Sequence, residues 1–151
     1  KTRRPLKERA VRFALALNSP LDPLPVSQSL IRQALDTADK ARTTDDYLLA
    51  VALAEQSQNA SPWWPDAYYL TELILHRYFL TQEFCSDGLD TWNLDQAARL
   101  SRGTDLRERC NTLRRFRTEL RQKSSKTEEL HLKRMQYLMK LKETAAKYDG
   151  R

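Results

Sequence analysis

The 151-residue chain is 40% hydrophobic, has only 3 glycines and 6 prolines, and carries a net charge of +6, divided into +5 over residues 1–12, −8 over residues 13–98 and +9 over residues 99–151. This composition favours one helical domain, and no apolar run approaches the roughly 18 residues that a membrane-spanning helix needs. The charge division is compatible with binding to nucleic acid or an anionic membrane, and equally with association within the chain or between copies of it.

The amino-terminal part of the chain predicts a helix followed by a linker. Leu6, Phe13 and Leu17 fall on one face of a helix over residues 6–17, together with two alanines. Three prolines then occur within residues 20–25 and cannot continue a helix. We therefore expect an extended linker between this helix and the next.

Two further helices are predicted after the linker. Ser27 is the expected cap of the first, whose apolar stripe is mostly alanine in its second half. Small side chains there let another helix approach closely. Thr43 or Thr44 is the expected cap of the second helix, which runs through the stretch YLLAVALAEQSQ.

The stretch SPWWPDAYY marks a corner between helices. Pro62 stops the preceding helix, and Pro65 suits the first position of the next one. Trp63 and Trp64 are expected to pack inside the corner, the alternative being that at least one belongs to an exposed recognition patch. The following helix, over residues 65–84, is apolar on more than one side and is predicted to be the most buried.

The last third of the chain is predicted to be helical and basic. A short helix through Leu100 follows the break CSDG, and Gly103 with Thr104 indicates a stop and a new start. From Leu106 a long basic helix begins, and the serines at 124 and 125 are the expected hinge of a hairpin.

The sequence thus predicts an all-α fold of antiparallel helix pairs. Its expected parts are a basic amino-terminal helix with its linker (residues 1–25), a helical domain (residues 26–103) and a basic carboxy-terminal helical hairpin packed on it (residues 104–151).

The stretch DDYLLAVALAEQSQNASPWWPDAYYL resembles a tetratricopeptide repeat that runs into its successor. Repeats of this family are about 34 residues long, and one spans residues 31–64 here, with Ala38 at the small crossing position and Tyr47 at the aromatic position of its second helix. The next repeat begins at Pro65. It departs from the family pattern at Glu72, where glycine or alanine is expected.

The resemblance implies a non-catalytic scaffold, adaptor or complex subunit that binds a peptide or a partner helix in a groove. The implied groove-facing residues, called the repeat groove below, are Arg32, Asp36, Asp39, Tyr69, Leu70, Leu73, His76 and Arg77. The arginines could bind carboxylates, and the tyrosine and leucines could accept apolar side chains. The alternative is that the amino-terminal or carboxy-terminal helix fills this groove.

The sequence shows no pattern of a catalytic or metal site. His76 and His131 are the only histidines, and neither a metal-ligand spacing nor a glycine-rich phosphate loop is present. We predict no enzyme activity, no cofactor and no bound metal. Cys85 and Cys110 are expected to be buried free thiols, with a single disulfide as the alternative.

The rival hypothesis is anion binding by the basic helix. Arginines recur on one of its faces, with another beside them: Arg107, Arg114, Arg117 and Arg121, with Arg115. Phe116 is the only aromatic residue among these arginines. The alternative is that this helix face is solvated, or that it docks onto the acidic part of the chain, residues 13–98. Expected partners are a protein or peptide, with nucleic acid, anionic lipid or a second copy of the chain as further candidates. Because the chain begins at Lys1, a removed signal or anchor is left open, and a cytoplasmic location is favoured.

Overall fold

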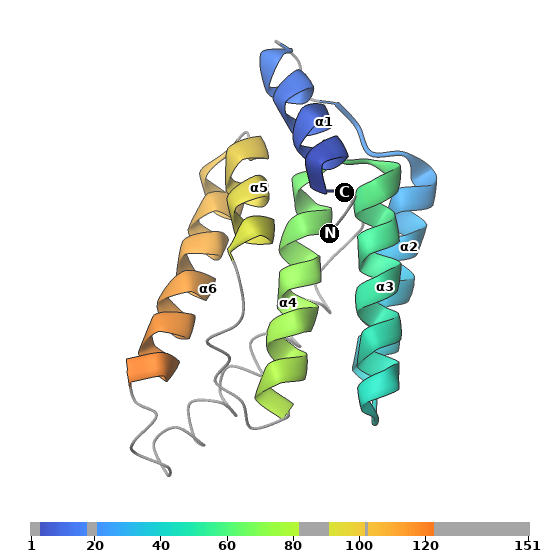
Figure 1. Cartoon of the computed structure of the whole chain (residues 1–151), viewed down its shortest axis with the longest axis vertical. Coiled ribbons are helices and arrows are strands. Elements are labelled where there is room, and N and C mark those ends of the chain that lie inside the picture. The colour runs from blue at the N-terminus through green and yellow to red at the C-terminus, as the bar shows by residue number, and fades with distance from the viewer. Residues whose placement is uncertain (1–3, 18–20, 82–90, 102, 123–151) are drawn as a thin grey trace.

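The computed structural model describes residues 4–17, 21–81, 91–101 and 103–122, which form six α-helices and no strand (Figure 1). The all-α prediction is confirmed. The helices are α1 (Arg4–Ala16), α2 (Pro25–Lys40), α3 (Thr44–Ala60), α4 (Pro65–Thr81), α5 (Trp92–Leu100) and α6 (Thr104–Gln122). The predicted hairpin hinge, Cys85 and His131 lie outside the described residues. Among those described, no helix is both long enough and apolar enough to cross a membrane.

Helix α4 lies at the centre of the described part of the molecule. Figure 1 shows α2 and α3 along one side of it and α5 and α6 along the other, with α1 at the end of the bundle beside α5. One hydrophobic core extends from Val11 of α1 to Leu113 of α6, and Tyr68 and Leu70 of α4 are among its most buried side chains. The burial predicted for this helix is confirmed. It follows from the apolar residues on more than one side of the helix.

The start of α3 is set by a capping box. The Thr43 hydroxyl accepts a hydrogen bond from the backbone N–H of Asp46 (3.2 Å), and the Asp46 carboxylate accepts from the N–H groups of Arg42 (2.9 Å) and Thr43 (3.2 Å). These backbone hydrogen bonds lower the pKa of Asp46. Of the two threonines considered as caps, Thr43 has this role.

The corner between α3 and α4 forms as its prolines predict, since α3 ends at Ala60 and α4 begins at Pro65. Trp64 is buried, as expected of corner packing. Trp63 is half-buried, and its indole N–H donates to the carbonyl oxygen of Asp22 in the linker (2.9 Å). The linker is thereby tied to the corner.

Ser27 does not cap α2, which corrects the prediction. The helix begins three residues earlier than a cap at Ser27 implies, with Leu24 as its N-cap, because Pro25 already has the backbone angle of a first helical residue. Ser27 is instead fully buried, with its Oγ 2.6 Å from Oγ of Ser61, and its carbonyl accepts from the Ser57 hydroxyl (2.7 Å). Buried hydroxyls therefore join the start of α2 to the end of α3.

The buried face of α1 also differs from the predicted one. Its buried residues are Lys7, Val11 and Ala14, whereas Leu6 is 63% and Phe13 67% exposed. The helix is rotated so that the Lys7 side chain reaches its hydrogen-bond partner Gln58 and the ring of Trp92. Of the apolar face that the sequence pattern predicts, Ala14 is buried, but Leu6 and Phe13 lie on the surface.

Candidate functional site

The repeat groove is not an open surface along α4. Its α4 members, Tyr69, Leu70, Leu73, His76 and Arg77, are all buried. Its α2 members, Arg32, Asp36 and Asp39, are exposed. Since α4 is packed between neighbours on both sides, its members of the repeat groove are used inside the protein, whereas those of α2 lie on the surface.

Arg77 shows this internal use most clearly. Its Nη1 lies 2.6 Å from Oδ1 of Asp39, so that two residues assigned to the repeat groove pair with each other and join α4 to α2. Asp36 pairs instead with Lys40 on the surface of α2 (3.1 Å). The structure therefore brings Asp39 and the buried Arg77 together as a partly exposed ion pair between α2 and α4.

Residues of α6 lie close enough to Tyr69 of α4 to act on it electrostatically. Burial raises the pKa of Tyr69 to about 12, while the positive charge of Arg109 on α6 acts in the opposite direction. The alternative in which a carboxy-terminal helix covers the repeat groove is thus consistent with the surroundings of Tyr69.

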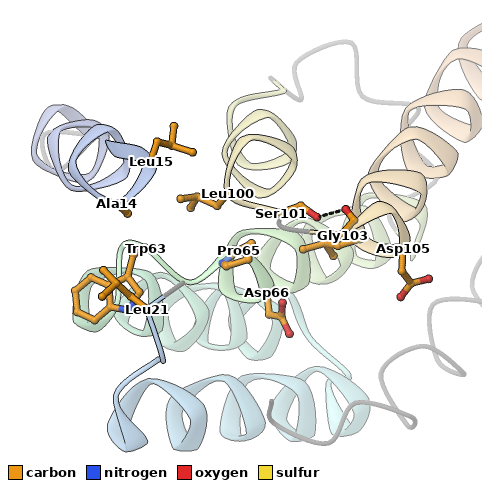
Figure 2. A pocket seen from close by; sticks show the side chains of 11 residues that line it. Ala14, Leu15, Leu21, Trp63, Pro65, Asp66, Leu100, Ser101, Gly103 and Asp105 are labelled. Atoms are coloured by element: carbon orange, nitrogen blue, oxygen red, sulfur yellow. Dashed lines mark hydrogen bonds between the residues drawn. The ribbon is translucent and has the colours of Figure 1, made fainter. Parts of the chain in front are cut away.

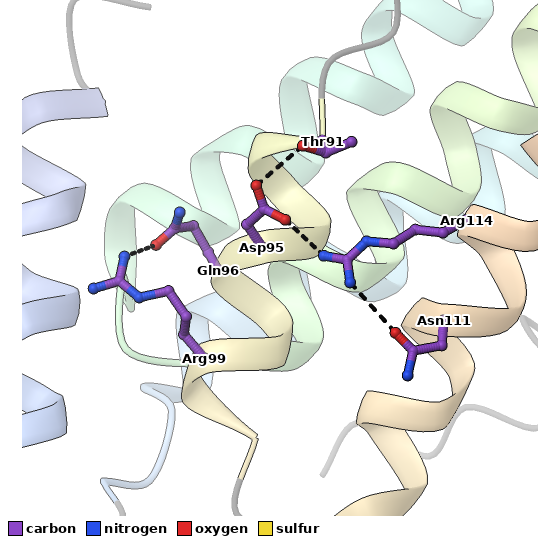
Figure 3. Close-up of polar contacts among 6 residues, drawn as sticks. All are labelled: Thr91, Asp95, Gln96, Arg99, Asn111 and Arg114. Carbon is purple, nitrogen blue, oxygen red and sulfur yellow. Dashed lines mark hydrogen bonds and ion pairs between the residues drawn. The ribbon is translucent and has the colours of Figure 1, made fainter.

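The arginines of α6 are divided between internal and surface roles. Arg114 Nη2 lies 2.6 Å from Oδ1 of Asp95 on α5, and its Nη1 donates to Asn111 (3.3 Å), as Figure 3 shows. The Asp95 carboxylate also accepts from the hydroxyl of Thr91 (3.0 Å). Arg107 and Arg115 are exposed, whereas the side chains of Arg117 and Arg121 lie outside the described part. Arg114 is therefore used to hold α6 on α5.

An apolar groove that the sequence did not predict lies at one end of the helices. It has a volume of about 340 Å³ and is formed by the end of α1, the linker, the corner between α3 and α4, and the junction of α5 with α6 (Figure 2). We call it the corner groove, and it is lined by Ala14, Leu15, Leu21, Trp63, Pro65, Asp66, Leu100, Ser101, Gly103, Asp105 and Leu106.

The corner groove has apolar walls and an acidic edge. Leu15 and Leu21 are each 41% exposed, and Trp63 and Pro65, which also line the groove, are partly exposed. Among the described residues of its lining, the charged ones are Asp66 and Asp105, both carboxylates. The sequence indicated this site only through one alternative, that at least one of Trp63 and Trp64 belongs to an exposed recognition patch.

A chain of buried hydrogen bonds connects four helices. Lys7 Nζ of α1 donates to Gln58 Oε1 of α3 (2.8 Å), and Gln58 Nε2 donates to Asn93 Oδ1 of α5 (3.0 Å) and to the hydroxyl of Thr71 on α4 (2.9 Å). Asn93 Nδ2 in turn donates to Glu72 Oε2 of α4 (3.2 Å). Sequence reasoning missed this chain, because each member has the polar character of a solvated helix position.

The buried pair of Glu72 and His76 ends this chain without forming an accessible acid–base site. His76 Nε2 lies 3.3 Å from Oε1 of Glu72, but both side chains are at least 96% buried. A substrate cannot reach them in this conformation. Within the described residues, no group of three or more histidine, cysteine, aspartate or glutamate side chains is placed to hold a metal ion.

No family model matches the chain, and neither a curated protein nor a solved structure matches it. The resemblance to a tetratricopeptide repeat therefore stays a prediction.

Proposed function

We propose that this protein is a non-catalytic interaction module whose corner groove binds a basic, amphipathic peptide or helix of a partner protein. The observation that carries the proposal is the pairing of partly exposed apolar walls with an acidic edge in one groove. Apolar anchors in a groove with oppositely charged residues at its edge are a common mode of peptide recognition.

The walls provide the binding free energy in this proposal. Covering Leu15, Leu21 and Trp63 removes apolar surface from water, which contributes roughly 25 cal/mol for each Å² buried. Part of that gain offsets the loss of motion when a partner binds, so the affinity need not be high. A partner with one or two large apolar side chains fits a groove of about 340 Å³.

The carboxylates at the edge of the corner groove select a positively charged partner. Asp66 and Asp105 favour lysine or arginine beside the apolar side chains of the partner. The side chain of Asp105 is 83% exposed and forms a surface ion pair with Arg109 (3.3 Å). Exposed pairs of this kind are weak, so an incoming cation can exchange with Arg109 at low cost.

The test is selection of peptides from a displayed random library, followed by affinity measurements on variants. We expect selected peptides to combine apolar residues with lysine or arginine, and Leu21→Glu to weaken their binding by at least about tenfold. Leu49→Glu is the matched control, because Leu49 is a similarly exposed leucine (55%) on α3, outside the corner groove. Circular dichroism melts should show that both variants are folded.

Two results would contradict the proposal. Equal affinity of the peptides for Leu21→Glu and Leu49→Glu would place binding elsewhere. Selection of acidic peptides, or salt-sensitive binding of an oligonucleotide that is lost in Arg107→Glu together with Arg115→Glu, would assign the function to the basic face of α6.

A further inference from the structure

A second cavity, partly open to solvent on the side of the exposed Glu55, lies between α1, α3, α4 and α5. It has a volume of about 370 Å³, which is within the range of small-molecule sites, and we call it the inner cavity. Its lining is unusually polar: Arg4 and Lys7 come from α1, Glu55 and Asn59 from α3, and Trp92 from α5. It is separate from the corner groove, because the two share no lining residue.

The α3 side of the inner cavity presents hydrogen-bond acceptors. Asn59 and Glu55 are four residues apart on α3 and therefore share one helix face. The side-chain oxygen of Asn59 is buried and accepts no hydrogen bond within the described residues. Leaving a buried acceptor without a partner costs free energy, so a donor brought by a ligand is favoured there.

The neighbouring polar side chains do not supply that donor. Gln58 uses its oxygen to accept from Lys7 and its amide group to donate to Thr71 and Asn93. Asn93 donates onward to Glu72. Within the described residues, Asn59 takes no part in this chain of hydrogen bonds.

The α1 side of the inner cavity presents positive charge. The guanidinium carbon of Arg4 lies 4.8 Å from the centroid of the Trp92 ring, and Nζ of Lys7 lies 5.9 Å from it. These cation–π contacts hold both cations at the cavity wall. The Trp92 indole N–H donates to Glu8 (3.2 Å), which fixes the ring that positions them.

We propose that the inner cavity binds a small zwitterion of the α-amino acid class. Its carboxylate lies on the α1 side with Arg4 and Lys7, and its ammonium group lies on the α3 side, where it donates to Asn59 and is paired with Glu55. The opposite charges of the two walls select both ends of such a ligand. The proposal is independent of peptide binding in the corner groove.

The experiment is a thermal-shift screen of the full chain with each proteinogenic amino acid, followed by calorimetric titration of those that raise the melting temperature. The N-acetyl derivative and the methyl ester of each binding amino acid are titrated in parallel, because the first lacks the ammonium and the second the carboxylate. We expect each derivative to bind at least about tenfold more weakly than the free amino acid.

The decisive variant is Asn59→Leu, which replaces the acceptor with an apolar side chain of similar size. Because the oxygen has no partner within the described protein, we expect the ligand-free variant to melt at the same temperature as the parent or above it, while amino acid binding falls at least about tenfold. Gln56→Leu, at an exposed position of the same helix, is the control and should leave binding unchanged.

The proposal is overturned if no amino acid binds, or if the blocked derivatives bind as tightly as the free amino acid. Unchanged binding by the folded Asn59→Leu variant would overturn it as well. Leu21→Glu should retain amino acid binding, so that failure here and failure of the corner groove proposal are distinguishable.

Discussion

The ammonium group of Lys7 donates a hydrogen bond of 2.8 Å to Gln58, 51 residues away, and both side chains are buried. This bond attaches α1 to α3 through polar groups. Gln58→Met keeps the size of the side chain but removes all three hydrogen bonds of the amide. We expect a loss of about 2–4 kcal/mol in the free energy of unfolding, because buried polar partners are left unsatisfied. Urea denaturation measures this loss.

The control for that prediction is Gln56→Met, because Gln56 is exposed on the same helix. Its effect should lie within about 0.5 kcal/mol. Similar stabilities of the two variants would show that the buried hydrogen bonds contribute little to folding.

The pair of Arg77 and Asp39 gives a second prediction. Asp39→Asn removes the charge that faces the buried guanidinium, while the half-exposed position of Asp39 lets water compensate in part. We expect a loss of about 1 kcal/mol in the free energy of unfolding. Asp36→Asn, which affects only the exposed pair with Lys40, should change stability by less than about 0.5 kcal/mol. Equal effects would argue against an internal role for Arg77.

A third prediction concerns alkaline pH. Burial raises the pKa of the Cys110 thiol from 9.0 to about 11, so the thiol ionises more readily in the unfolded chain than in the folded one. Its contribution to stability is complete below pH 9.0 and is lost as the pH rises from 9.0 to about 11. In Cys110→Ala we expect a shallower decline of the unfolding free energy in this window, by up to about 1.4 kcal/mol per pH unit.

Urea denaturation at a series of alkaline pH values measures that slope. The variant should also be less stable at neutral pH, since Cys110 is fully buried and its removal leaves a cavity. Tyr69 continues the decline at higher pH in both proteins, because burial raises its pKa to about 12. Parallel slopes in parent and variant below pH 10 would contradict the assignment to Cys110.

The arginines of α6 give a fourth prediction. Arg114→Gln should destabilise the protein by about 0.5–1 kcal/mol, because the ion pair with Asp95 between α6 and α5 is lost. Arg115→Gln should have no measurable effect on stability, since Arg115 is exposed and bonds only to Thr112 on its own helix (3.2 Å) in the described contacts. The difference between the variants should shrink in concentrated salt. A difference that persists there would not be electrostatic.

Some local features could be predicted from single residues. Pro65 sets the start of α4 because of its fixed backbone angle, and a threonine hydroxyl caps α3, although the sequence left Thr43 and Thr44 as alternatives and the structure selects Thr43. The cap predicted at Ser27 was wrong, because Pro25 starts α2 earlier. The central place of α4 follows from apolar residues on more than one side. These features depend on local chemistry and need no knowledge of the rest of the fold.

Features that depend on a distant partner could not be predicted. Lys7 has the character of a surface residue until Gln58 and Trp92 are known to lie beside it. Once Lys7 faces inward, helix geometry places Leu6 and Phe13 outward. The corner groove combines residues from four separate parts of the chain, so that no single stretch of sequence marks it.

The hydrogen bonds that connect Lys7, Gln58, Asn93 and Glu72 also restrict how this sequence can diverge. Changing one member leaves the next polar group buried without its partner, whereas changing the whole set to apolar residues of similar volume can be nearly neutral. Natural variants should therefore either retain all four polar residues or replace all four together. Correlated substitution at these four positions would be its evolutionary signature.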